Sequence, residues 1–246
     1  MWQGLLRIAL TITANTLLCL AFSDPSLPAG KEKEKTSATK KKTAKSPTRK
    51  KDEFVDEGAF VRFSITYLPS VVKVLCSLLT LCEVTVILYA WRTGRGLLYC
   101  AHPDALTRLS YESLIGNLLL IAGAALRLWC FATLRELFTF HIGIREGHKL
   151  IKEGPYAVVR HPSYTGIFLM NVGAMLAHFA QDGVLRCLLP SHVTEVMLDT
   201  AVFAMGLVVT CVFLARRTNT EEALLSDQFG EEWEAYADAT PRFLPF

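Results

Sequence analysis

The chain has 246 residues, of which 51% are hydrophobic, and its mean hydropathy is positive. This length suits one or two ordinary domains, but the composition is too apolar for most soluble proteins. The formal net charge of +3 hides an asymmetry, since ten Lys or Arg residues lie between positions 31 and 51. The sequence therefore predicts an all-α, polytopic helical membrane protein, with about four or five membrane segments.

Seven cysteines are scattered along the chain, an odd number with no C-x-x-C pair. Most of them lie in apolar runs, where a cysteine behaves as a small hydrophobic residue. They are Cys19, Cys76, Cys82, Cys100, Cys130, Cys187 and Cys211. We therefore expect buried thiols rather than disulfides or a metal site.

The first 62 residues divide into an apolar start and a basic segment. Residues 1–23 contain an apolar stretch of about 15 residues, so we expect either a signal peptide or a first membrane span. Residues 24–62 are expected to be a basic, disordered linker, because positions 31–52 hold no aliphatic or aromatic residue larger than Ala. The linker either helps to set the membrane topology or lies on an anionic leaflet, where each basic residue contributes roughly 1 kcal/mol.

Residues 63–135 are expected to contain two membrane spans, at 67–91 and 114–134. Charged residues interrupt both apolar runs, namely Lys73, Glu83 and Arg127. Charges at membrane depth are costly and usually face protein or a watery cavity. Lys73 and Glu83 are therefore noted as unusual, without an assigned role, and Arg127 lies inside the second span.

Residues 136–246 are expected to form a third region, which carries the candidate site residues. A polar connector at 138–160 precedes two apolar segments, 163–179 and 194–215, which predict a helical hairpin. Residues 220–237 are acidic and amphipathic and predict a C-terminal helix. Its apolar residues recur at helical spacing: Leu225, Phe229, Trp233 and Tyr236.

The positive-inside rule predicts where the polar segments lie. If the Lys-rich linker is cytosolic, two spans return the connector to the cytosol, and the hairpin returns the C-terminal region to the same side. Both polar segments would then face the cytosol, where they could meet. A cleaved signal peptide would place the linker and both segments in the lumen instead.

Several common site types are missing from the sequence. There is no phosphate-binding loop, no dinucleotide fingerprint and no nucleophile elbow. His141, His148 and His161 are separated by seven and thirteen residues, which match no zinc pattern. We expect no metal and no nucleic-acid partner.

Two polar stretches together resemble the isoprenylcysteine carboxyl methyltransferase family over about the last hundred residues. The first stretch reads His148-x-Leu150-x-x-x-Gly154-Pro155-Tyr156-x-x-Val159-Arg160-His161-Pro162-x-Tyr164-x-Gly166. The second reads Arg217-x-x-x-Glu221-Glu222-x-x-Leu225 and then Phe229-Gly230-x-x-Trp233-x-x-Tyr236-x-x-x-x-Pro241-x-x-x-Pro245. A family member carries Gln at the position of His141, and the Lys-rich linker is not part of the family pattern.

The resemblance implies a multi-pass enzyme of the endoplasmic reticulum membrane with its active site facing the cytosol. Such an enzyme transfers a methyl group from S-adenosyl-L-methionine to the C-terminal carboxylate of a prenylated cysteine in processed CaaX proteins, so its partners are prenylated protein C-termini and the lipid bilayer. By this resemblance Arg217 is the catalytic residue and binds the substrate carboxylate. The implied cofactor-binding residues are His148, Lys149, Leu150, Ile151, Tyr156, His161, Pro162, Ser163, Tyr164 and Glu221.

Elementary chemistry agrees with this implied reaction. A C-terminal carboxylate has a pKa near ~3.5, so it is ionised at neutral pH and needs no general base. It needs alignment and removal of water, which a guanidinium at Arg217 and a closed pocket could supply. The rings of Tyr156 and Tyr164 are candidates to face the sulfonium, where each contributes on the order of 0.5–2 kcal/mol.

Other interpretations stay open from the sequence. Arg217 and Glu221 are also spaced as a helix-surface ion pair, Arg160 as an anchor at the membrane interface, and Trp233 and Tyr236 as packing residues. The alternative functions are a phospholipid amine N-methyltransferase, an NADPH-dependent membrane sterol reductase and a membrane scaffold without catalytic activity. An amine acceptor would not require Arg217.

Overall fold

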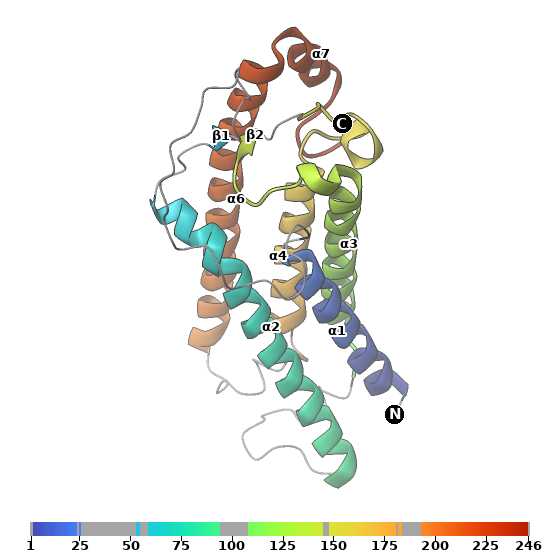
Figure 1. The fold of residues 1–246 in the computed structure, drawn as a ribbon. Coiled ribbons are helices and arrows are strands. Elements are labelled where there is room, and N and C mark those ends of the chain that lie inside the picture. The colour runs from blue at the N-terminus through green and yellow to red at the C-terminus, as the bar shows by residue number, and fades with distance from the viewer. Residues whose placement is uncertain are drawn as a thin grey trace, which may run out of the picture.

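The computed structural model describes residues 2–23, 25, 53–54, 59–93, 108–144, 148–180, 182–183 and 193–245. Most of the expected linker at 24–62 lies outside these residues. Helices α3, α4 and α6 run lengthwise through the molecule, α1 and α2 slant beside them, and the short α7 lies at one end (Figure 1). They are α1 (Trp2–Ala21), α2 (Ala59–Thr93), α3 (Tyr111–Leu134), α4 (Pro162–Phe179), α6 (Val193–Phe229) and α7 (Glu231–Ala239).

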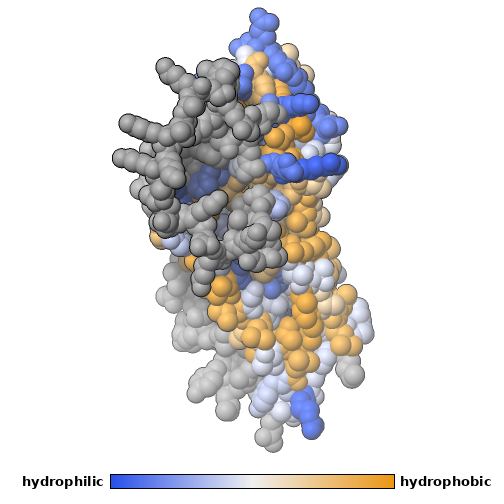
Figure 2. Space-filling view, viewed as in Figure 1, coloured by the Kyte–Doolittle hydropathy of each residue, from blue (hydrophilic) through white to orange (hydrophobic). Residues whose placement is uncertain are grey.

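Among the described residues, four helical segments are long and apolar enough to cross a membrane, and they confirm the expected class of polytopic helical membrane protein. They are Trp2–Ala21, Arg62–Thr93, Tyr111–Leu137 and Ala201–Phe229. Figure 2 shows hydrophobic residues over the middle of the visible face and hydrophilic residues toward the α7 end. Within the described part of the chain, strands are limited to β1 (Glu53–Phe54) and β2 (Gly143–Ile144), which pair antiparallel.

Helices α3 and α4 touch through glycine, and their backbones approach very closely. A Cβ atom added to Gly173 would lie 2.6 Å from the carbonyl oxygen of Gly116 and 2.6 Å from the amide nitrogen of Leu120. Nearer the start of α4, a Cβ atom added to Gly166 would lie 2.8 Å from the carbonyl oxygen of Gly123. Side chains at these positions would force the two helices apart, so the glycines allow the close spacing of α3 and α4.

We expect the Gly173→Ala substitution to lower the free energy of unfolding by about 1–3 kcal/mol, because the new methyl group would overlap backbone atoms that cannot rotate away. Denaturant unfolding in detergent micelles measures this loss. Gly206→Ala is the matched control, since its Cβ would meet only the flexible end of Met175. Equal stability of the two variants would contradict a close α3–α4 contact.

Helix α1 is part of the helical bundle and contributes to its core. Ala14, Leu18 and Ala21 form one buried cluster with residues of α3 and α4. Near its start, the fully buried Arg7 bonds to Glu83 of α2 at 2.7 Å and to Asp182 after α4 at 2.6 Å. This ion network lies at the end of α4 opposite Pro162, where the candidate site begins.

The C-terminal helices differ from the prediction. We expected a separate acidic helix over residues 220–237, whereas α6 continues without interruption from the membrane segment through Phe229. The break falls at Gly230, whose φ of 51° is a left-handed conformation that glycine adopts readily. Nothing in the acidic sequence before Gly230 stops a helix, so one rigid element carries both Arg217 and Glu221.

Candidate active site

A cavity of about 680 Å³ lies between α2, α4, α6 and the polar connector. This volume falls in the range of about 300–1,000 Å³ that is usual for ligand pockets. One end is polar and includes His161, Tyr164 and Arg217, whereas the walls along the helices are apolar, with Val72, Met170 and Phe213 among them. Such a cavity could bind ligands that have both charged and hydrocarbon parts.

The connector reaches the cavity through a short 3-10 turn, η3 (Gly154–Ala157). Gly154 adopts a φ of 62°, which only glycine takes readily, and a Cβ there would lie 3.1 Å from Thr133 Oγ1. The Tyr236 hydroxyl of α7 donates to the carbonyl oxygen of Tyr156 at 2.7 Å. Burial raises the pKa of Tyr156 well above its ordinary value, so its hydroxyl stays neutral.

The Tyr236→Phe substitution is expected to lower the free energy of unfolding by about 1 kcal/mol, because it leaves the Tyr156 carbonyl without its donor. Amide hydrogen exchange should also become faster in η3. Tyr111→Phe removes the same hydroxyl from a side chain that is 85% exposed and serves as the control. If both variants behave like the wild type, α7 does not anchor this turn.

Helix α4 begins at the polar end of the cavity. Pro162 occupies the first helical position, which needs no amide donor, and its side chain is fully buried beneath the site. The next residue, Ser163, accepts a 2.7 Å hydrogen bond from Arg127 Nη1 on α3. The Ser163 hydroxyl, at the edge of the cavity, is therefore held by its hydrogen bond from Arg127.

Arg127 is a buried cation that joins three parts of the chain. Its Nε donates to the Ala21 carbonyl oxygen at 2.7 Å, and its guanidinium lies 5.1 Å from the centre of the Phe131 ring. Further rings surround it at 5.6–5.7 Å, from Phe22, Phe138 and Phe140. These contacts meet the expectation that charges at membrane depth face protein.

Helix α6 brings its two predicted site residues to the same tyrosine. Arg217 Nε donates to the Tyr164 hydroxyl at 2.8 Å, and that hydroxyl donates to Glu221 Oε2 at 2.6 Å. Arg217 also donates through Nη2 to the Phe140 carbonyl oxygen. The cation and the carboxylate are thus joined through Tyr164, which holds both at the cavity wall.

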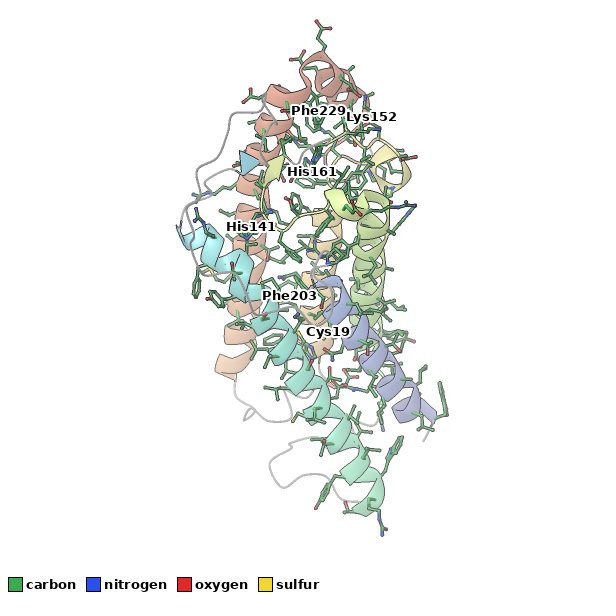
Figure 3. The ribbon with its side chains drawn as sticks, viewed as in Figure 1. Cys19, His141, Lys152, His161, Phe203 and Phe229 are labelled. Carbon is green, nitrogen blue, oxygen red and sulfur yellow. The ribbon has the colours of Figure 1, made fainter. Side chains whose placement is uncertain are left out.

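The structure brings almost all predicted site residues to one cavity. Figure 3 shows His161 on the α7 side of the bundle, together with Lys152 and Phe229, and Cys19 and Phe203 farther along it. Ten predicted residues line the cavity: His148, Lys149, Leu150, Ile151, Tyr156, His161, Ser163, Tyr164, Arg217 and Glu221. The predicted residue Pro162 lies beneath them, and His141 also lines the cavity.

Sequence reasoning missed the residues that support this site from behind. Glu222 bonds to His161 at 3.0 Å and to Arg242 at 2.5 Å. Only the adjacent Glu221 was predicted as a site residue, although Glu222 belongs to the same sequence motif. No sequence signal pointed to Arg242. Across the described residues, no group of three or more His, Cys, Asp or Glu residues is placed to hold a metal ion.

The fold and the cavity together define a multi-pass helical membrane protein with an amphipathic ligand site. Residues 115–227 match the isoprenylcysteine carboxyl methyltransferase family. The resemblance seen in the sequence is confirmed over this region, which contains α4 and most of α3 and α6, and therefore Tyr164, Arg217 and Glu221.

Three similar proteins show the extent of the likeness. Protein-S-isoprenylcysteine O-methyltransferase B of Arabidopsis thaliana is 34% identical, over 53% of this chain and 58% of its own length. The protein-S-isoprenylcysteine O-methyltransferase of Homo sapiens is 29% identical, over 57% of this chain and 44% of its own length. The protein-S-isoprenylcysteine O-methyltransferase of Schizosaccharomyces pombe is 31% identical, over 40% of this chain and 34% of its own length. The matches thus cover less than two thirds of each relative.

Proposed function

We propose that the protein transfers a methyl group from S-adenosyl-L-methionine to the C-terminal carboxylate of a prenylated cysteine, forming a methyl ester. One observation carries this proposal: Tyr164 holds Arg217 and Glu221 together where the polar and apolar parts of one cavity meet. Arg217 could bind the substrate carboxylate and Glu221 could bind the cofactor. The apolar walls could hold the prenyl chain.

The polar end fits the chemistry of the cofactor. S-adenosyl-L-methionine combines a cationic sulfonium and an amino group with an aromatic base, and it supplies an electrophilic methyl group. Glu221, whose side chain is 34% exposed, offers a carboxylate to its amino group or ribose. The rings of Tyr156 and Tyr164 offer faces for a cation, and the connector from His148 to Ile151 offers backbone groups.

The chain would promote the reaction by positioning. The substrate carboxylate is already ionised, so no residue needs to remove a proton before its oxygen attacks the methyl carbon. The cofactor, held by Glu221, the two tyrosine rings and the connector, would supply the methyl group and would leave as a neutral thioether. Arg217 would hold the carboxylate, while the surrounding apolar walls exclude water that would compete for its charge.

We further propose that the prenyl chain lies along the apolar walls and that the active site faces the cytosol on the endoplasmic reticulum membrane. The walls are built from membrane helices, so a hydrocarbon chain could occupy the cavity with its cysteine at the polar end. The processed C-termini of prenylated proteins are then the partners, together with the bilayer. The basic segment before α2 supports a cytosolic orientation.

Purified protein in detergent, incubated with methyl-labelled cofactor and a farnesylcysteine analogue, tests the proposal. A base-labile labelled ester is the expected product, since esters hydrolyse in base and methylated amines do not. Thermal stabilisation by S-adenosyl-L-methionine should accompany it. Stabilisation by NADPH alone, without ester formation, would instead favour a reductase and overturn the proposal.

A further inference from the structure

Two neighbouring acids on α6 face opposite ways. Glu221 faces the cavity and bonds to Tyr164, whereas the next residue, Glu222, is 9% exposed and lies behind the site. Glu222 Oε1 lies 3.0 Å from His161 Nε2 and 3.5 Å from Arg160 Nη1, and its Oε2 accepts from Arg242 Nη2 at 2.5 Å. One carboxylate thus contacts three nitrogen-bearing side chains, and two of them, Arg160 and His161, line the cavity.

The C-terminal segment from Pro241 to Phe243 is bonded to the start of α4. The Arg160 amide donates to the Pro241 carbonyl oxygen at 2.8 Å, and the His161 amide donates to that of Arg242 at 3.0 Å. Thr165 Oγ1 donates to the Phe243 carbonyl oxygen at 2.9 Å. We call Pro241–Phe243 the C-terminal strap. It places Arg242 beside Glu222 and covers His161 from the side away from the cavity.

These contacts fix the orientation of the His161 ring. Its face stacks on Tyr164, with 5.5 Å between ring centres and 8° between planes. Its Nε2 faces Glu222, and a carboxylate can only accept there, so Nε2 carries the hydrogen. Its Nδ1 lies on the Glu221 side, 3.9 Å from Oε2. The ring therefore presents the other nitrogen toward the cavity.

We propose that Glu222 and Arg242 are positioning residues: they hold His161 with Nε2–H directed at Glu222, so that Nδ1 accepts a hydrogen bond from an N–H or O–H group of the bound cofactor. This inference rests on the proposed function. Arg160 and Arg242 keep Glu222 ionised and in place, and without them the ring would lose its fixed partner. The role is one of orientation, and neither Glu222 nor Arg242 touches the reacting atoms.

Calorimetric binding of S-adenosylhomocysteine to the purified full-length protein tests the inference. We expect Glu222→Gln and Arg242→Gln each to raise the dissociation constant by about 10- to 100-fold, the size of effect seen for lost charged hydrogen bonds. At saturating cofactor, kcat should change far less than the KM for the cofactor. Arg242→Lys should retain part of the affinity, because it keeps a charge beside Glu222.

Matched controls and a spectroscopic measurement keep the test independent of folding. Glu234→Gln and Arg216→Gln make the same changes at exposed positions and should leave binding unchanged. In imidazole-¹⁵N NMR spectra, the wild type should show one fixed His161 tautomer protonated at Nε2, and Glu222→Gln should show a mixture. Wild-type affinity and an unchanged spectrum in Glu222→Gln and Arg242→Gln would overturn the inference, whereas a wild type that binds no cofactor would overturn the proposed function instead.

Discussion

Replacing Arg217 with Ala is expected to lower kcat/KM for a prenylcysteine carboxylate by about 100- to 1,000-fold, a loss of roughly 3–4 kcal/mol of transition-state stabilisation. The substrate carboxylate would enter a cavity whose walls are mostly apolar and lose water there. Without the Arg217 guanidinium, the carboxylate would lose the partner proposed to replace its hydration. Steady-state kinetics with labelled cofactor measures the change.

Two variants separate a specific role for Arg217 from a general effect of charge. Arg217→Lys should recover only part of the activity, since an ammonium group is a point charge and cannot form the paired contacts of a guanidinium. Arg216→Ala removes the neighbouring exposed Arg and should leave kinetics unchanged. A fully active Arg217→Ala protein would show that Arg217 only ties α6 to Tyr164 and Phe140.

Replacing Arg7 with Met is expected to lower the free energy of unfolding by about 3–5 kcal/mol, the largest stability loss that we anticipate from a single substitution. Arg7 is fully buried and lies between the carboxylates of Glu83 and Asp182. It also donates to the Asp182 carbonyl oxygen at 2.6 Å. Without it, two buried carboxylates would face each other with no cation between them.

A second substitution should restore part of this loss. In Arg7→Met/Glu83→Leu, only Asp182 remains charged, and it keeps the 2.6 Å hydrogen bond from Ser110 Oγ. Replacing a buried ion pair by apolar residues is often close to neutral, so we expect partial recovery. Arg92→Met removes an exposed Arg from the end of α2 and is the control for denaturant unfolding in detergent. A double variant less stable than Arg7→Met would contradict this account.

Much of the fold could be predicted, because apolar length is a strong signal for membrane helices. The expected spans at 67–91 and 114–134 lie within α2 (Ala59–Thr93) and α3 (Tyr111–Leu134). The segment expected at 163–179 is almost the same as α4 (Pro162–Phe179). Glu83 and Arg127 are buried in protein, as is usual for charges at membrane depth, whereas Lys73 is only half-buried.

The partners of these charges could not be predicted, because they lie far apart in the chain. Arg7 is separated from Glu83 by 76 positions and from Asp182 by 175. The site shows the same limit. The family resemblance indicated Glu221, but only the fold shows that Glu222 turns away from the cavity and that Arg242 returns to meet it. An acidic helix surface does not reveal which of its carboxylates is buried.

Methyl transfer in vesicles that contain two competing acceptors tests the central claim most directly. The wild-type protein is reconstituted with methyl-labelled S-adenosyl-L-methionine, a farnesylcysteine analogue and a lipid with a free amine headgroup. We predict that the label appears in a base-labile ester of the farnesylcysteine and that Arg217→Ala loses this product. Label found in a base-stable methylated amine of the lipid, at the same level in Arg217→Ala, would contradict the account.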